Sequence, residues 1–527
     1  MFRIELAKNG MIDGPSGTLP VAERLQRLRR YSSNFRNGIF DHECNTDYSE
    51  YLRHLRSLKC RGRSRTAGVT TVLHLNTDSG PTKFYLAVFI DPSTQAGIQS
   101  RRVVVPVANP GGETGFIGGW IIDHAQDLFV AVEFANTGTN TQRTALRLCS
   151  WSGSQVSQID HPAAAVPHLQ ISPPPGYPGD PGEVSHIGPT IIEGSYVIWT
   201  QLCAVIDHAY KYSIHICNWR TGEMVSRIDL GNKRQSFVLL DDAYILILPH
   251  ESDSDSDSEP DLSVYSLAPS PPSRPICSLQ LPSLTLGPGE HISNCEISTS
   301  RHSTPEAHFR DDPSVSMVVL KYSLKIGAPP LTTMSRTCYL LIPYAALLAQ
   351  IRTAVDSNSN SDSDSPLVPP VPVPWQDWGA LASLRLWVPV HPHERHISDR
   401  VSLVPCGSRM PIVTFDDAGC TRASVYVFDI NPLVARQTPH ILAAQPESGP
   451  GATATATAIV KHVEAALPGI VDPGCSASPF VVYRFGIPLP EVEHFAWRMI
   501  QAVRMSMTGF TVTFGDGPHE TDHTWTV

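Results

Sequence analysis

The sequence lacks the cysteine pattern of a disulfide or zinc framework. Its 11 cysteines are scattered over 527 residues, with an odd total and no Cys-x-x-Cys pair, as is typical of free thiols in a reducing compartment. No apolar run approaches the ~20 residues that a helix needs to span a bilayer. The N-terminus, MFRIELA, carries charges where a secretory signal needs an apolar core. We therefore expect a soluble intracellular protein, cytoplasmic or nuclear, with no membrane partner.

Positive charge is also scarce. The chain has 40 Lys and Arg against 50 Asp and Glu, a formal net charge of −10, and no basic block that would neutralise a row of phosphates. Nucleic acid is therefore not expected as a partner. Only 17% of residues are charged, whereas the 36 glycines and 46 prolines match what a turn-rich β protein needs.

The common catalytic signatures are missing: no phosphate-binding Gly-rich loop followed by Lys-Ser/Thr, no His-Glu-x-x-His and no Gly-x-Ser-x-Gly occurs. His391, His393 and His396 lie close to Glu394 but lack a second group of ligands at matching spacing, which favours a polar loop over a metal site.

Two carboxylate pairs and two cysteines are the other chemical candidates. Adjacent residues on a strand point to opposite faces, so Asp241-Asp242 and Asp416-Asp417 are better explained as turns than as an acid/base pair. Cys149 and Cys217 lie within predicted strands, where a buried small residue is expected rather than a nucleophile. The sequence thus predicts a non-enzymatic protein with no catalytic, cofactor-binding or metal-binding residues.

From about Val69 the pattern changes to short β-type runs separated by turn residues. Between Phe237 and Leu248, Asp241-Asp242 separates two apolar runs, which predicts a tight hairpin. The other early runs are Thr70–His74, Phe84–Phe89, Arg102–Val107, Trp120–Ile122 and Leu128–Phe134.

An internal repeat carries the prediction of architecture. Residues 145–160 align with residues 213–229, and Cys, Trp, Gly, Ser, Ile and Asp recur in step. Each copy is a strand, a turn after a Trp, and a second strand, which is the pattern of one propeller blade. A single such sheet cannot bury both faces, so several must pack radially. Trp151 and Trp219 are then wedges between blades; the alternative is that they are exposed binding aromatics.

We expect an all-β fold, a β-propeller-like domain of about seven irregular blades over residues 66–527. Residues 1–65 are expected to be a mostly helical segment, with one short helix at Pro20–Tyr31 and a weaker pattern at Tyr51–Leu58. Arginines on the outer face of that helix are expected to be solvated. Disordered insertions are expected near residues 162–188, 251–261 and 356–374, two of which contain Ser/Asp repeats.

Four segments carry a family resemblance: Ile4–Pro15, Leu19–Tyr31, Cys217–Gly222 and Pro374–Gly379. The chain resembles the F-box proteins expanded in mushroom-forming (basidiomycete) fungi, which have an N-terminal F-box and a long propeller-like region. The resemblance implies a ubiquitin ligase substrate receptor, in which the F-box docks a Skp-type adaptor.

The F-box itself should precede Ile4, yet Met1 is only three residues upstream. Either the gene model begins too late or the chain is a truncated paralogue, and a Skp-type adaptor is an expected partner only if an upstream F-box is missing. We expect a non-catalytic protein–protein interaction module with an unknown protein target, its contacts supplied by the insertions. The alternative function is a carbohydrate-active or carbohydrate-binding β-propeller.

Overall fold

The structure is a computed structural model. It describes residues 1–14, 19–47, 63–66, 68–76, 83–107, 116–136, 142–151, 160–171, 186–204, 210–232, 235–249, 261–267, 274–301, 307–327, 333–359, 372–379, 383–389, 401–415, 422–434, 436, 457–458, 470–472, 480–489, 500–515 and 521–527.

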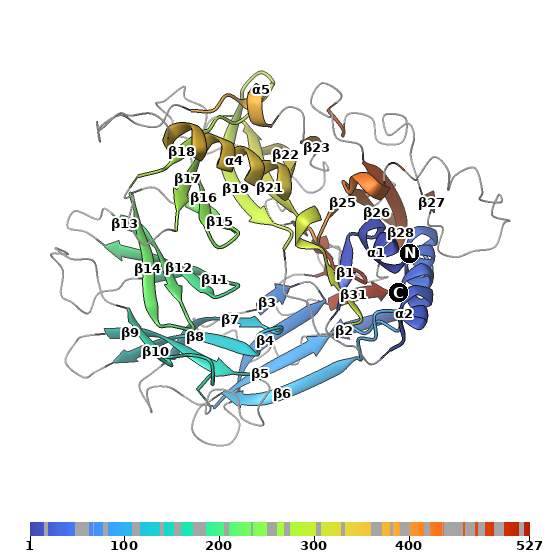
Figure 1. The fold of residues 1–527 in the computed structure, drawn as a ribbon, viewed down its shortest axis with the longest axis horizontal. Coiled ribbons are helices and arrows are strands. Elements are labelled where there is room, and N and C mark those ends of the chain that lie inside the picture. Colours follow the sequence, from blue (N-terminus) through green and yellow to red (C-terminus); the bar gives the residue numbers. More distant parts are fainter. Residues whose placement is uncertain are drawn as a thin grey trace.

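The chain folds as a seven-bladed β-propeller, as the sequence predicted. Seven sheets surround a central axis, and in most of them the first strand in chain order lies near the centre while the last lies at the periphery (Figure 1). In blades 1 to 4 neighbouring strands are antiparallel and follow one another along the chain, so each of these blades is a meander. The radial arrangement gives each sheet a partner on both faces.

Blades 1 to 4 have four strands each. Blade 1 contains β3 (Arg63–Thr66), β4 (Val69–Asn76), β5 (Lys83–Ile90) and β6 (Arg101–Val107). Blade 2 contains β7 (Phe116–Asp123), β8 (Leu128–Asn136), β9 (Gln142–Ser150) and β10 (His168–Ile171). Blade 3 contains β11 (His186–Glu193), β12 (Tyr196–Ala204), β13 (Tyr210–Asn218) and β14 (Glu223–Gly231). Blade 4 contains β15 (Gln235–Leu240), β16 (Tyr244–Pro249), β17 (Leu262–Ser266) and β18 (Cys277–Leu279).

Blades 5 to 7 are less regular. Blade 5 contains β19 (Glu290–Thr299), β21 (Met317–Ile326), β22 (Thr333–Pro343) and β23 (Leu384–Pro389). Blade 6 contains β25 (Arg409–Phe415), β26 (Arg422–Asp429), β28 (Val481–Pro488) and β27 (Thr457–Ala458). Blade 7 contains β29 (Ile500–Met505), β30 (Gly509–Phe514), β31 (Thr521–Thr526) and β2 (His42–Asp47), and β24 (Ser402–Val404) adds a strand parallel to β29.

The ring closes through strand β2. It comes from the N-terminal part of the chain, yet it pairs antiparallel with the C-terminal strand β31 over six residues, from His42↔Thr526 to Asp47↔Thr521. The division of the chain at residue 65 stays a prediction, but β2, which lies before it, is built into blade 7.

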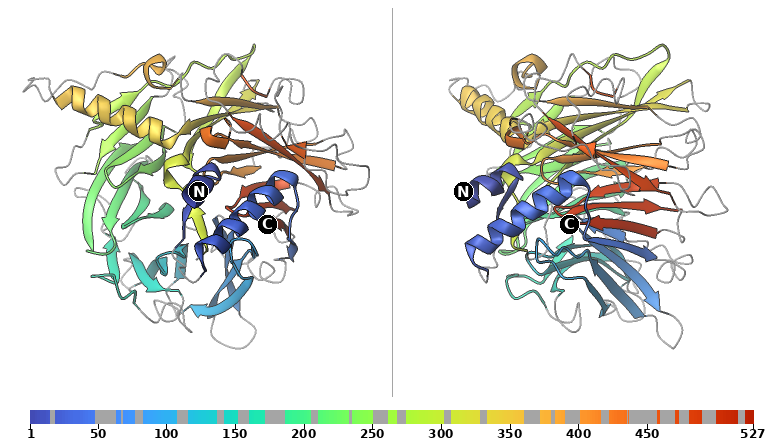
Figure 2. Two further views of the ribbon diagram at one scale, coloured as in Figure 1. Left: turned by 45° about the vertical axis from the view of Figure 1, so that its right-hand side comes forward. Right: turned by 90° about the vertical axis from the view of Figure 1, so that its right-hand side faces the viewer.

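Helices gather on one face of the propeller, where α1 (Phe2–Lys8), α2 (Val21–Asn37), α4 (Tyr344–Ser359) and α5 (Trp375–Trp378) lie (Figure 2). The predicted helix is confirmed: α2 begins directly after Pro20, continues beyond Tyr31 to Asn37, and is capped by Gly38, whose φ of 63° is left-handed. The same face carries a short 3-10 helix at Pro313–Val315 and a two-stranded ribbon of β1 (Met11–Asp13) and β20 (Phe309–Asp311). The helical pattern at Tyr51–Leu58 lies outside the described residues.

The predicted hairpin is also confirmed. Strands β15 and β16 pair from Gln235↔Pro249 to Leu240↔Tyr244, and Asp241 occupies the turn with φ 51°. Aspartate tolerates this conformation, and its side chain accepts a hydrogen bond from the Ala243 backbone N–H at 2.8 Å. Asp241-Asp242 is therefore a turn, as expected.

Part of the expected insertions is regular structure. His168–Ile171 forms β10 because it pairs with β9, from His168↔Arg147 to Ile171↔Thr144. Residues 356–359 continue helix α4. Neither segment is the disordered insertion that the sequence predicted, and most of the remaining insertion residues lie outside the described part of the chain.

In the part of the chain that the structure describes, six of the seven interfaces between blades are apolar. Between blades 3 and 4, for example, Ile198 and Ile216 pack with Leu239 and Ile247 in one buried cluster. Comparable clusters join blades 1 and 2, 2 and 3, 4 and 5, 5 and 6, and 6 and 7. Their burial is the main favourable contribution to stability.

The repeated tryptophans are wedges at these interfaces. Trp219 is fully buried, lies in the cluster between blades 2 and 3, and donates from Nε1 to the Gly194 carbonyl at 3.2 Å. Trp151 is 6% exposed in the cluster between blades 1 and 2. The packing interpretation of both residues is confirmed, and they are not exposed binding aromatics.

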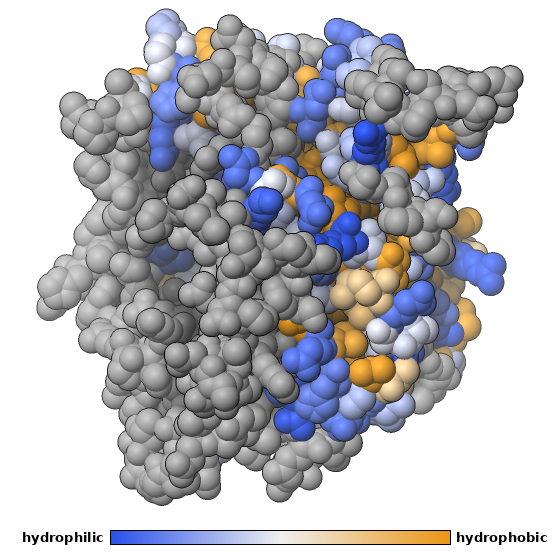
Figure 3. Space-filling view, turned by 90° about the vertical axis from the view of Figure 1, so that its left-hand side faces the viewer, coloured by the Kyte–Doolittle hydropathy of each residue, from blue (hydrophilic) through white to orange (hydrophobic). Residues whose placement is uncertain are grey.

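The surface is less informative about function than the core is about the fold. On the flank that Figure 3 shows, the described residues form a mosaic of hydrophobic and hydrophilic patches, as on most folded proteins. No helix among the described residues is long and apolar enough to cross a membrane.

Trp219→Ala should lower the free energy of unfolding by about 3–5 kcal/mol, because it removes a large buried aromatic side chain and leaves a cavity. Urea or guanidinium unfolding measures the change. Met224→Ala, at a residue that is 48% exposed, is the control and should have little effect. An unchanged midpoint for Trp219→Ala would contradict the wedge interpretation.

Candidate functional site

The N-terminal segment packs against the interface between blades 6 and 7. Leu28, Tyr31 and Phe35 of α2 belong to the same buried cluster as Val425 of blade 6 and Phe510 of blade 7. Phe35 meets the rings of Tyr483 and Phe485 edge-on, at centroid distances of 5.6 and 5.5 Å. Helix α2 thus completes a core that two blades begin.

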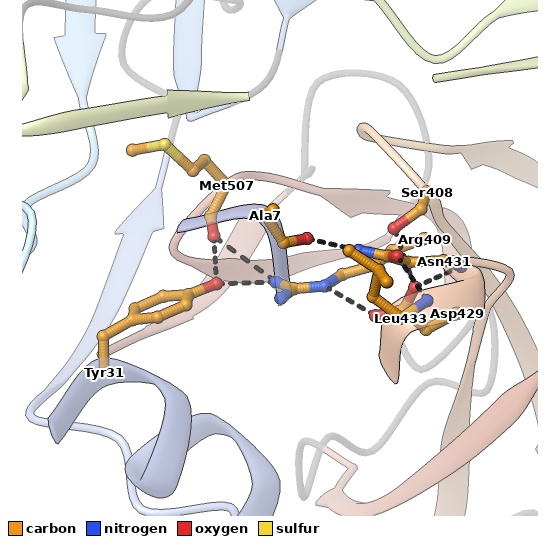
Figure 4. A network of polar contacts seen from close by, with 8 residues as sticks. All are labelled: Ala7, Tyr31, Ser408, Arg409, Asp429, Asn431, Leu433 and Met507. Carbon is orange, nitrogen blue, oxygen red and sulfur yellow. Dashed lines mark hydrogen bonds and ion pairs between the residues drawn. The ribbon is translucent and has the colours of Figure 1, made fainter. Parts of the chain in front are cut away.

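A buried polar network fixes this position (Figure 4). Nη1 of Arg409 donates to the Tyr31 hydroxyl at 2.6 Å, and this hydroxyl donates to the Met507 carbonyl. Nε of Arg409 lies 3.5 Å from Oδ2 of Asp429, which is 2% exposed. Burial raises the pKa of Tyr31, although Arg409 opposes this shift. A buried charge needs such partners, because an unpaired one is strongly destabilising.

The same network holds helix α1. Asn431 donates from Nδ2 to the Ala7 carbonyl at 3.1 Å, and its backbone N–H donates to Oδ1 of Asp429. Ser408 donates to the same carboxylate oxygen at 2.7 Å. Blade 6 therefore binds both N-terminal helices through one carboxylate and its neighbours.

The seventh interface, between blades 7 and 1, is polar, and we call it the seam. Among the residues of blade 1 whose side chains the structure describes, the buried apolar cluster here holds Val72 and Ala87, with Phe89 beside them. Thr526 donates to the Pro92 carbonyl of blade 1 across the seam. Register places six buried polar residues on one face of blade 7: Arg504, Thr511, Thr513, Asp522, Thr524 and Thr526.

A pocket of about 570 Å³ opens beside the seam on the helical face. It is lined by Arg27 of α2, His42 of β2, His308 before β20, and the loop after β5 from Pro92 to Ser100. Blade 1, blade 7, the N-terminal segment and the connection between β19 and β21 all contribute to it. Its size is in the range of small-molecule sites.

The wall formed by the loop is held from several sides. Ser93 and Ile98 exchange backbone hydrogen bonds of 2.8 and 2.9 Å. The Ser93 hydroxyl donates to the carbonyl of the C-terminal residue, Val527. The His308 N–H donates to the Ala96 carbonyl at 2.8 Å. At Gly97, φ is +74°, and a Cβ would lie 2.4 Å from Nε2 of His308, so only glycine fits there.

The pocket combines one permanent cation with two imidazoles. Nη1 of Arg27 lies 3.4 Å from Nε2 of His308 and donates to the Thr94 carbonyl at 3.4 Å. Burial, followed by the nearby Arg27, lowers the pKa of His308, so this ring is neutral near pH 7. Because a guanidinium only donates, Nε2 of His308 faces it as an acceptor. Glu23 would compete with an anionic ligand for Arg27, because its carboxylate lies 2.9 Å from Nη2 of Arg27.

One further pair in the pocket has the distance of a base and a hydroxyl nucleophile. Nε2 of His42 lies 2.7 Å from Oγ1 of Thr94. A nucleophile activated in this way also needs a group that orients the base. Among the described residues, no carboxylate is hydrogen-bonded to His42. The pair is therefore better suited to hydrogen-bonding a ligand than to nucleophilic attack on it.

The residues singled out from the sequence do not form this site. Cys149 and Cys217 are buried in strands, and burial raises their pKa values to about 12 and about 11, so they are poor nucleophiles, as expected. Asp241-Asp242 lies in the hairpin of blade 4. Asp416-Asp417 and the histidine group at 391–396 lie outside the described residues.

Sequence reasoning missed Arg27, His42, Thr94 and His308. Arg27 was part of the arginine-rich helix face that we expected to be solvated. His42 and His308 are single histidines with no motif around them, so no sequence signal joins them. The glycine at position 97 is the feature of the sequence that comes nearest to indicating this site, because a glycine in the left-handed conformation marks a place where another group approaches the backbone closely.

Comparisons with known proteins identify no family. No family model matches the chain, and no curated protein matches it. The acylaminoacyl peptidase of Pyrococcus horikoshii is similar at 6% identity and a TM-score of 0.27, over 70% of this chain and 57% of that one. The β-propeller domain of the Trilobed protease from Pyrococcus furiosus is similar at 8% identity and a TM-score of 0.21, over 54% of this chain and 91% of that domain.

These findings correct the functional expectation. The similar structures are peptidases and a protease propeller, so the prediction of a non-catalytic interaction module of the F-box type, with a carbohydrate-related alternative, is wrong. The propeller alone is supported, because one architecture serves unrelated functions. The chain spans under two thirds of the peptidases' length, 57% in the first case. Membership of the fungal F-box family and a Skp-type partner stay predictions, which no comparison tests.

Tyr31→Phe should lower the free energy of unfolding by about 1–3 kcal/mol, because it leaves buried hydrogen-bonding groups of Arg409 and Met507 without their partner. Urea unfolding measures the change. Tyr212→Phe, at a half-buried tyrosine of blade 3, is the matched control. Equal stability of the two variants would show that the network does not hold the N-terminal segment.

Proposed function

We propose that this propeller is a receptor for a small molecule that bears an anionic group, phosphate, sulfate or carboxylate, and that it binds this group in the pocket at the seam. The observation that carries the proposal is the guanidinium of Arg27 in the wall of a pocket of about 570 Å³, beside two imidazoles and the Thr94 hydroxyl. Guanidinium groups bind planar or tetrahedral oxyanions through paired hydrogen bonds.

The surroundings support this choice of ligand. The backbone loop of the wall is preformed by hydrogen bonds to the chain end and to His308, so little ordering is required on binding. The neutral His308 offers a hydrogen bond without a second fixed charge. Glu23 opposes an anion, because its carboxylate is paired with Arg27. Its side chain is 43% exposed, so water can solvate this carboxylate when a ligand takes its place on the guanidinium.

The opposing variants Arg27→Gln and Glu23→Gln test the proposal with phenyl sulfate as the probe. Arg27→Gln should weaken binding about tenfold or more, since a charge-assisted hydrogen bond is lost. Glu23→Gln should strengthen binding, because the guanidinium loses its competing carboxylate. Isothermal titration calorimetry measures both affinities.

Two controls make the result specific. Arg30→Gln changes the same charge on an exposed position of the same helix, and it should leave the affinity unchanged. Phenol, which matches the probe without its charge, should bind far more weakly. The proposal fails if phenyl sulfate does not bind the native chain, or if Arg27→Gln and Arg30→Gln have the same effect.

A further inference from the structure

Thr94 is the residue at which the polar groups of the pocket converge. Its backbone carbonyl accepts a hydrogen bond from Nη1 of Arg27 at 3.4 Å, and the same nitrogen lies 3.4 Å from Nε2 of His308. The Thr94 hydroxyl lies 2.7 Å from Nε2 of His42. The carbonyl and hydroxyl oxygens of one threonine lie within about 5 Å of each other, because they belong to one residue. The guanidinium and the pair of His42 and Thr94 are therefore two neighbouring binding points.

The hydrogen bond between His42 and Thr94 does not use all that the hydroxyl offers. A hydroxyl has one hydrogen to donate and two lone pairs that accept. The tautomer of His42 decides which partner donates. If Thr94 donates, its oxygen can still accept from a ligand; if His42 donates, the hydroxyl hydrogen remains for a ligand. Thr94 is exposed and lines the pocket, so a ligand can reach this hydroxyl.

A hydroxyl group is the ligand group that fits this pair in both cases, because it donates and accepts. A carbonyl, an ether or a second oxyanion only accepts, so each fits one tautomer of His42. An ammonium group only donates, and the guanidinium of Arg27 would repel it. The chemistry of the pair therefore favours a hydroxyl beside the anionic group.

The same loop offers an apolar surface for the carbon atoms that join the two groups. Ile98 is half-buried, lines the pocket and packs against the buried cluster between blades 6 and 7. Pro92 lines the pocket as well, with an apolar ring. Binding sites for small molecules commonly combine such apolar walls with a few placed polar groups.

We propose that the ligand of this pocket is a hydroxylated oxyanion, in which the hydroxyl is on the carbon next to the one that bears the anionic group or one carbon further. Phosphate or sulfate esters of polyols and hydroxy acids belong to this class. Arg27 binds the oxyanion, and the Thr94 hydroxyl binds the ligand hydroxyl. His42 is a positioning residue, because it acts by orienting Thr94. This specificity rests on the anion-binding function proposed above.

Hydroxyphenyl sulfates test the specificity against phenyl sulfate, which lacks only the hydroxyl. The tighter of the 2-hydroxy and 3-hydroxy isomers should bind the native chain about fivefold more tightly than phenyl sulfate, since one neutral hydrogen bond is gained. The 4-hydroxy isomer, whose groups lie at opposite ends of the ring, should bind like phenyl sulfate. Isothermal titration calorimetry measures these ratios. Equal affinities for all of these sulfates, or a preference confined to the 4-hydroxy isomer, would overturn the proposal.

Thr94→Val tests the assigned residue, because valine keeps the branched shape of threonine and lacks the hydroxyl. The ratio between the preferred isomer and phenyl sulfate should fall to about one in this variant, by loss of the same hydrogen bond. Ser100→Ala is the matched control, since Ser100 is another exposed hydroxyl residue of the pocket, and it should keep the native ratio. A ratio that survives Thr94→Val, or that is lost in Ser100→Ala, would show that the ligand hydroxyl binds elsewhere.

Two variants of His42 test its positioning role. His42→Phe keeps a ring but removes the nitrogen that faces Thr94, so it should lower the ratio. His42→Gln places an amide that can hydrogen-bond to the Thr94 hydroxyl, and it should restore the ratio. A lowered ratio in both variants would indicate a merely structural role for His42 and contradict its assignment.

The same titrations separate this specificity from the function on which it rests. If phenyl sulfate binds through Arg27 and no isomer is preferred, the hydroxyl specificity is wrong and the anion-binding function stands. If none of these sulfates binds the native chain, the anion-binding function is refuted and the specificity with it.

Discussion

Closure of the ring is the constraint on which the rest of this structure depends. Each blade is a sheet with two faces, and both need a neighbour, so an open row of blades would leave two faces in water. Here the closing contact is the pairing of β2 with β31, which joins residues near the two ends of the chain over six positions. The apolar clusters between blades stabilise the ring, whereas the pairing of β2 with β31 closes it.

The closing strand also decides where the N-terminal segment lies. Because β2 is fixed at the edge of blade 7, the preceding helix α2 lies over the interface between blades 6 and 7. There Tyr31 meets Arg409, and the ribbon of β1 and β20 crosses from the connection in blade 5. A buried guanidinium is costly unless it is well paired. The network around it therefore makes this one docking position strongly preferred.

The seam has the opposite character. Six interfaces exclude water with aliphatic and aromatic side chains, whereas the seventh buries threonines, Arg504 and Asp522. Polar contacts between blades contribute less net stability than apolar burial, because they replace hydrogen bonds to water. The pocket of about 570 Å³ lies beside this polar interface.

The sequence by itself determined the local elements and their repetition. The signals that it carries are short-range. Alternating apolar residues predicted the strands, and the Asp241-Asp242 turn predicted the hairpin. The in-register Trp151 and Trp219 predicted the wedges and a propeller of about seven blades. Only the tertiary structure decided the site: His42 meets Thr94, and Arg27 meets His308 across 281 positions of sequence. Such contacts depend on how the ring closes, and no local pattern encodes that, because the residues acquire a common environment only when the two ends of the chain pair.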